Sequence, residues 1–260
     1  MKEEFKSLAY GIFHNPIFIK ALIGTVFVIL VVSGGPVMMN GGTMTMEEEY
    51  AGIMPIIAYM IMLLCACEAA YMFCDDFTDK TLNYEILIGK NRRQVYLARI
   101  IVTLAVVITA IVCEVLSIAL SIYIWGFGSA ESVKWLFIRL LMLGLEYIRT
   151  AAFLIFVCQI VKTMTNAFGA VGLILLPMIV AMLNGEERVS YLPIGTAIQH
   201  LATPATQNKY NIAIGGIKQY MRYDWSLSGN IIAEVVITSI LFTALYLFLG
   251  WIYFKKDDLP

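Results

Sequence analysis

Residues 99–124 read RIIVTLAVVITAIVCEVLSIALSIYI, an apolar run interrupted by a single acidic residue, Glu114. A helix needs about 20 apolar residues to cross a bilayer core about 30 Å thick, and this run is long enough. Backbone groups within lipid must be hydrogen-bonded inside the segment, which a helix achieves and an isolated strand does not. The run is therefore predicted to be a transmembrane helix.

The composition extends this prediction to the whole chain. Of its 260 residues, 60% are hydrophobic and 14% are charged, whereas ordinary soluble proteins have about 45–50% apolar and about 25% charged residues. A soluble chain of this size would lack the polar residues to cover its surface. The net charge of −1 and the five cysteines exclude a nucleic-acid-binding domain and a disulfide-stapled scaffold.

Six stretches have the apolar length of a membrane span, which predicts an all-α integral membrane protein with one transmembrane domain over residues 1–260. The spans are expected at residues 17–38, 53–73, 99–124, 134–160, 166–183 and 230–254. Residues 1–16 carry apolar residues at helical spacing and predict an interfacial amphipathic helix. Between the spans we expect a cytoplasmic coupling segment at 74–98 and an extracellular segment at 184–229 that holds a re-entrant or short helix.

The orientation follows from the loops. No Lys or Arg occurs in 34–52 or 125–133, whereas basic residues cluster before the first span, between the second and third, and after the last. The positive-inside rule therefore predicts a multi-pass protein of the cell membrane with both termini cytoplasmic. A cleaved signal peptide is the alternative for the N-terminus, but Glu3 and Glu4 precede the apolar run and disfavour it.

The main polar stretch on the cytoplasmic side, residues 74–99, reads CDDFTDKTLNYEILIGKNRRQVYLAR. Its acidic start favours a helix, and its glycine indicates a break. The simplest alternative is a solvated loop that only fixes the topology. The order of residue types is more specific: Asp76-Phe77, then Thr81-Leu82, an apolar turn, Gly89-x-x-Arg92, and Arg99 opening the next helix.

That order resembles the permease subunits of ABC type-2 exporters, which have the type V exporter fold. The family's stretch runs from an acidic residue and an aromatic through Gly-Thr-Leu or Gly-Thr-Ile, a basic residue and an apolar turn to Gly/Pro-x-Ser-Arg and a helix that opens on Lys. Two positions differ from this pattern: Lys80 stands where Gly is usual, and Asn83 stands where a basic residue is usual. The predicted spans and the N-terminal helix extend the resemblance, more loosely, over the whole chain, and lantibiotic-immunity and peptide-export permeases are the most similar members.

The resemblance implies that this chain is not itself an enzyme. A coupling helix near 75–90 would dock onto a separate ABC ATPase subunit, which would bind ATP and Mg, while this chain would bind no cofactor. The chain would pair with a second copy of itself or a related permease, lie among membrane lipid, and export an amphipathic or hydrophobic substrate, with a peptide as the expected class. The expected docking residues are Asp75, Asp76, Phe77, Thr81, Leu82, Glu85, Gly89, Arg92 and Arg93.

Several charged residues fall inside the predicted spans, where they are costly and therefore candidates for function. Glu146 and Arg149 are three residues apart and share a helix face, so they can pair. Glu114 lies at a similar depth on the preceding span. Glu68 and Arg99 lie at the inner ends of their spans, where they can pair. These groups are either structural ion pairs or the polar lining of a substrate path.

Two further functional classes are weighed against transport. A membrane-embedded protease or lipid transferase would use Glu114 and Glu146 as catalytic carboxylates, and an importer would use the chain as a substrate-binding subunit. The sequence contains no G-x-x-x-x-G-K-[ST], H-E-x-x-H or Gly-x-Ser-x-Gly motif, which favours a transport subunit without catalytic or metal-binding residues of its own.

Overall fold

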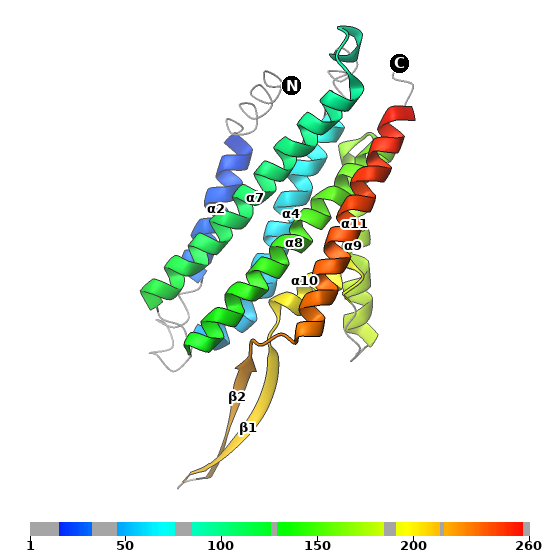
Figure 1. Ribbon diagram of the computed structural model, residues 1–260. Coiled ribbons are helices and arrows are strands. Elements are labelled where there is room, and N and C mark those ends of the chain that lie inside the picture. The colour runs from blue at the N-terminus through cyan, green and yellow to red at the C-terminus, as the bar shows by residue number, and fades with distance from the viewer. Residues whose placement is uncertain are drawn as a thin grey trace.

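A computed structural model describes residues 16–32, 46–75, 85–125, 129–184, 191–213 and 216–256. Long helices run side by side along one axis (Figure 1). The helices are α2 (Pro16–Val32), α4 (Met46–Ala70), α7 (Arg92–Trp125), α8 (Ala130–Val161), α9 (Met164–Asn184), α10 (Ile194–Ala202) and α11 (Gly229–Lys256), and the strands are β1 (Ala205–Ala213) and β2 (Gly216–Asp224). The predicted helix at 1–16 falls almost entirely outside the described residues.

Four of these helices are long and apolar enough to cross a membrane. They cover Glu47–Cys74, Arg92–Trp125, Ala130–Val161 and Gly229–Lys256, and they coincide with four of the predicted spans. The apolar parts of α2 and α9 that the structure describes, Leu22–Val31 and Met164–Leu176, are shorter, so the other two spans stay predictions. The protein is thus a helical protein embedded in a membrane.

Local sequence explains where the long helices begin. Helix α4 starts with three glutamates in its first turn, where negative charge is favoured by the helix dipole. Helix α7 starts before the predicted 99 because Asn91 Oδ1 accepts a hydrogen bond from Arg93 N at 3.0 Å and so satisfies a free N–H group of the first turn. In α8, the N-cap Ser129 accepts from Ser132 N.

Helix α4 does not end as a regular α-helix. It continues into a π-helix, η1 (Tyr71–Asp75), whose Met72, Phe73 and Cys74 are buried. A π-helical turn contains an extra residue, and such turns are uncommon and frequent at functional sites. Here the π-helix leads directly toward the segment predicted to couple the two subunits.

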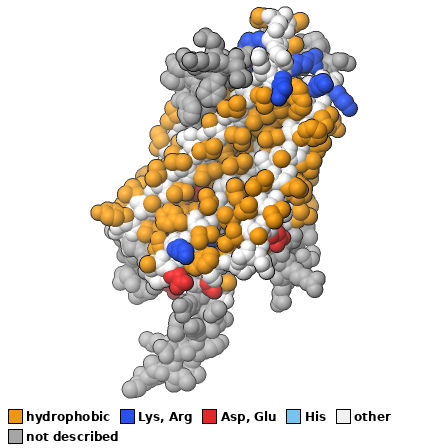
Figure 2. All heavy atoms as spheres, viewed as in Figure 1, with side chains coloured by type: hydrophobic (Ala, Val, Ile, Leu, Met, Phe, Trp, Pro, Cys, Tyr) orange, Lys and Arg blue, Asp and Glu red, His pale blue; other side chains and the backbone are white. Residues whose placement is uncertain are grey.

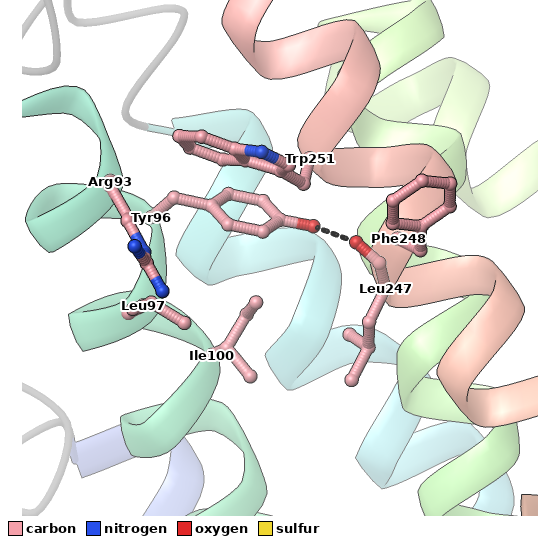
Figure 3. Close-up of a pocket in the computed structure, with 7 residues that line it drawn as sticks. All are labelled: Arg93, Tyr96, Leu97, Ile100, Leu247, Phe248 and Trp251. Atoms are coloured by element: carbon pink, nitrogen blue, oxygen red, sulfur yellow. Dashed lines mark hydrogen bonds between the residues drawn. The ribbon is translucent and has the colours of Figure 1, made fainter.

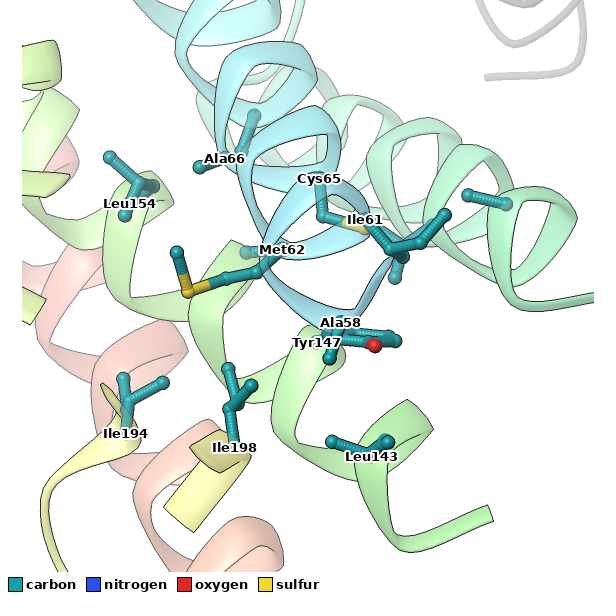
Figure 4. Packing of buried hydrophobic residues seen from close by; sticks show 14 of the residues in the cluster. Ala58, Ile61, Met62, Cys65, Ala66, Leu143, Tyr147, Leu154, Ile194 and Ile198 are labelled. Atoms are coloured by element: carbon teal, nitrogen blue, oxygen red, sulfur yellow. The ribbon is translucent and has the colours of Figure 1, made fainter. Parts of the chain in front are cut away.

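Helix α8 lies at the centre of the bundle, and α4 and α10 pack against it. Figure 4 shows Met62 and Cys65 of α4 near Tyr147 of α8, with Ile194 and Ile198 of α10 beside them. These side chains are buried. The outward surface is also apolar, with orange side chains over most of the bundle in Figure 2, as expected for helices surrounded by lipid.

The segment predicted at 184–229 differs in part from expectation. Helix α10 is the short helix expected there, but β1 and β2 form an antiparallel hairpin that pairs Ala205 with Asp224 and Ala213 with Gly216. The hairpin projects from one end of the bundle (Figure 1). The all-α prediction therefore holds for the bundle and misses a two-stranded addition, which Gly215-Gly216 between two runs rich in Ile and Tyr could have indicated.

Candidate functional site

One end of the bundle is strongly basic. The start of α2, the start of α7 and the end of α11 lie there (Figure 1), and Lys and Arg side chains gather there in Figure 2. Lys255 and Lys256 occupy the last turn of α11, which suits the negative end of the helix dipole. The hairpin projects from the opposite end.

Residues 85–91, here called the 85–91 turn, stand beyond the helix ends at this basic end (Figure 1). Gly89 N bonds to Ile86 O at 3.0 Å and Lys90 N bonds to Glu85 O at 3.2 Å, the pair of bonds that closes a helical turn in a Schellman motif. Gly89 has φ +93°, a conformation that favours glycine. The break predicted at Gly89 is confirmed and has a geometric cause.

The base of the turn is fixed by ion pairs. Glu85 Oε2 lies 2.9 Å from Arg99 Nη1, and Glu85 Oε1 lies 3.0 Å from Lys90 Nζ. Arg99 is buried on α7, so the contact ties the turn to the body of that helix. Arg92 Nη1 also donates to the carbonyl of Lys255 at 3.2 Å, which joins the start of α7 to the end of α11.

These contacts bear on two expectations. Glu85, which is expected to contact the partner, also makes ion pairs within the chain. Arg99 was a candidate partner for Glu68, yet it pairs with Glu85, and Glu68 Oε2 has no hydrogen-bond partner among the described residues. The Glu85 carboxylate, on the turn that precedes α7, reaches the Arg99 guanidinium at 2.9 Å.

The tip of the turn is apolar and exposed. Leu87 is 78% exposed and Ile88 is 79% exposed. The prediction treated both residues only as part of an apolar turn. The signal that could have singled them out is the aliphatic run 86–88 between Glu85 and Gly89-Lys90. Of the other expected docking residues, Asp76, Phe77, Thr81 and Leu82 lie outside the described part of the chain, Asp75 is the last residue of η1, and Arg93 is exposed.

A second arrangement surrounds Arg139 of α8, which is 3% exposed. Its guanidinium donates to backbone carbonyls on both sides of the hairpin, at Trp225 (2.7 Å) and Ser226 (3.3 Å) and at His200 (3.1 Å), Leu201 (2.9 Å) and Thr203 (3.0 Å). One arginine thus satisfies the C-terminal carbonyls of α10 and fixes both ends of the hairpin.

Arg149, also on α8, anchors the chain just before α10. It lies 3.2 Å from Glu146 Oε2 and donates to the carbonyls of Tyr191 and Leu192. Ser239 of α11 donates to Glu146 Oε1 at 2.7 Å. The Glu146–Arg149 pair therefore joins α8 to α11 and to the chain before α10.

Glu114 belongs to a different contact. The hydroxyl of Tyr147 donates to Glu114 Oε1 at 3.3 Å, which links α7 to α8. No contact joins Glu114 to Glu146 among the described residues, so the two carboxylates suggested for catalysis are held by separate partners.

Sequence reasoning missed Arg139, although a basic residue inside a predicted span was a visible signal. Its partners are backbone carbonyls, which no residue type reveals. Over the described part of the chain, no three His, Cys, Asp or Glu side chains are grouped so that they could hold a metal ion. No family model matches the sequence, and no curated protein matches it either.

Proposed function

We propose that this chain is the permease subunit of an ATP-driven ABC exporter with the type V exporter fold. The observation that carries the proposal is the 85–91 turn: an exposed aliphatic tip, Leu87 and Ile88, on a base fixed by ion pairs at the basic end of the bundle. Adjacent exposed aliphatic side chains on a fixed base support a contact surface for another protein. The motif in residues 74–99 gives the partner its identity, an ABC ATPase subunit.

The contacts around the turn suit the transmission of movement. A push on Leu87 and Ile88 reaches α7 through the Glu85–Arg99 pair, and it reaches α11 through Arg92 and the carbonyl of Lys255. A lever fixed in this way moves helices as rigid bodies, which is how packed helices switch between states. ATP and Mg would be bound by the partner, and this chain would convert its movement into alternating access.

The remaining parts of the proposal rest on the distribution of basic residues and on the resemblance to exporter permeases. The basic end would face the cytoplasm, by the positive-inside rule, and both termini would lie there. A second copy of the chain or a related permease would complete the transport path. The expected substrate is an amphipathic or hydrophobic peptide, moved out of the cell.

The test is affinity capture of the full-length chain from native membranes, with its ABC ATPase identified by its P-loop peptide. Leu87→Ser with Ile88→Ser should weaken ATPase retention by tenfold or more, since two exposed aliphatic anchors are lost. The parallel variant Phe77→Ala with Leu82→Ala tests the neighbouring residues. The matched control is Tyr123→Ser with Ile124→Ser, an exposed pair (88% and 54%) at the far end of α7.

Two results would reject the proposal. One is capture of the chain without any ABC ATPase from native membranes that contain ABC ATPase subunits. The other is equal ATPase retention by wild type and both docking variants, which would remove residues 77–88 from the interface.

A further inference from the structure

A groove opens between α7 and α11 at the basic end. It has a volume of about 410 Å³, and Figure 3 shows how its walls are built. Leu97 and Ile100 come from α7 and Leu247 and Phe248 from α11, while Arg93 stands at the α7 side. The groove therefore combines an apolar interior with one cation.

The floor of the groove is fixed rather than a loose gap. Tyr96 reaches across from α7, and its hydroxyl donates to the carbonyl of Leu247 at 2.9 Å. Its ring centroid lies 5.5 Å from that of Trp251 and 5.2 Å from that of Phe254. Gly250 leaves room for this crossing, because a Cβ there would lie 2.5 Å from the Tyr96 hydroxyl.

A second hollow adjoins the first. It has a volume of about 440 Å³, shares Phe248 and Trp251 with the groove, and is flanked by Lys255 and Lys256. The two hollows thus share a wall made by Phe248 and Trp251. Arg93 is exposed, and its guanidinium forms no ion pair or hydrogen bond with the described residues, which leaves it available to a ligand.

We infer that this surface binds one anionic phospholipid. Its phosphate lies between Arg93 and the two lysines, and its acyl chains occupy the two hollows beside Phe248 and Trp251. Basic pockets between transmembrane helices suit anionic headgroups, and tryptophan suits the depth of the headgroups. A second copy of the chain, packed face to face, would add its own cations to a rim that already has three. An anionic phospholipid supplies both a negative charge to pair with the three cations and acyl chains to fill the apolar hollows.

Titration of the delipidated full-length protein with lipid tests the inference by native mass spectrometry. The probes are palmitoyl-oleoyl phosphatidylglycerol and the phosphatidylcholine with the same chains. Wild type should bind phosphatidylglycerol about tenfold more tightly or better, and Arg93→Gln should weaken it about fivefold. Arg93→Gln with Lys255→Gln and Lys256→Gln should remove the preference. Lys20→Gln, an exposed cation at the start of α2, is the matched control and should retain it.

A steric pair tests the hollows separately from the charges. Leu97→Trp should fill the groove and weaken both lipids about tenfold, whereas Leu116→Trp, on the exposed surface of the same helix, should change neither. Three results would overturn the inference: equal binding of the two lipids by wild type, equal losses in Arg93→Gln and Lys20→Gln, or no effect of Leu97→Trp. Free glycerol phosphate, which lacks acyl chains, should not compete at the same concentration, and competition by it would also reject a lipid site. None of these readouts depends on transport.

Discussion

The 85–91 turn precedes α7 and the 191–204 segment lies between α9 and β1, and arginine fixes both, but in opposite ways. At the turn, Arg99 and Arg92 fix the base and leave Leu87 and Ile88 exposed. In the 191–204 segment, Arg139 and Arg149 are themselves buried and are surrounded by the carbonyls that they satisfy. The turn leaves apolar side chains exposed, whereas the 191–204 segment has its polar groups buried and hydrogen-bonded within the chain.

The difference shows what each arrangement requires of a partner. Exposed aliphatic side chains on a fixed base gain free energy when another surface covers them. A segment whose carbonyls already bond to buried guanidinium groups needs no partner and is costly to open. Loss of an arginine should therefore unfold the second region, whereas loss of the tip should affect only binding at the first.

The largest expected effect is at Arg139. Arg139→Met leaves five carbonyls without their donor and should lower the free energy of unfolding by about 3–5 kcal/mol. Arg139→Lys keeps the charge with fewer donors and should lie between. Thermal unfolding in detergent measures both, with the exposed Lys134→Met as control. If Arg139→Met and Lys134→Met have the same melting temperature, Arg139 does not stabilise this region as proposed.

The next largest effect on stability distinguishes the two buried carboxylates, Glu146 and Glu114. Glu146 contacts Arg149 and Ser239, so Glu146→Gln removes the counter-charge of a buried arginine and should cost about 2–3 kcal/mol. Glu114 has Tyr147 as its partner, and Glu114→Gln keeps an acceptor for that hydroxyl. We expect Glu114→Gln to cost less than about 1 kcal/mol. Equal melting temperatures for the two variants would contradict the larger stabilising role that we assign to Glu146.

A smaller effect is expected at the basic end. Gly250→Ala forces Tyr96 to move, since the new Cβ would lie 2.5 Å from its hydroxyl, and should cost about 1–3 kcal/mol. Gly172→Ala in α9 meets no atom within 4 Å and should be neutral or stabilising by up to about 1 kcal/mol. The two melting curves give the comparison. A Gly250→Ala variant as stable as Gly172→Ala would show that the ends of α7 and α11 are loosely packed.

The smallest effect depends on pH. Burial lowers the pKa of His200 from its ordinary 6.5, and Arg139 binds the carbonyl of the same residue. The unfolded chain therefore binds a proton first as the pH falls, and stability should decline from about pH 6.5 down to the lowered pKa. His200→Gln should reduce this decline in a series of melts between pH 7.5 and 5. An unchanged decline would assign it to other groups.

The sequence predicted the bundle well because membrane spans are a local signal. The residues of α7, α8 and α11 are apolar over the required length, and the break at Gly89 follows from the conformational freedom of one residue. The starts of the helices were less well predicted, since α7 begins at Arg92 among residues that hydropathy alone assigns to a loop.

The contacts within the candidate site were harder to predict. Arg139 satisfies carbonyls from residues that are 61 to 87 positions away in the chain, and carbonyls carry no sequence signature. Arg99 has Glu85 of the 85–91 turn as its ion-pair partner rather than Glu68. Which partner a charged residue pairs with depends on the tertiary structure, and the spacing of residues along one helix does not reveal it.

The π-helix at Tyr71–Asp75 has a consequence for insertions and deletions. A π-turn accommodates one residue more than an α-turn, so it absorbs the extra residue without rotating the rest of the helix. Deleting one residue there should restore regular α-helical geometry with little rotation, whereas deleting one from a regular turn of α4 would rotate all later residues of the helix by about 100° around its axis. These five positions are therefore where the helix should best tolerate the loss of one residue.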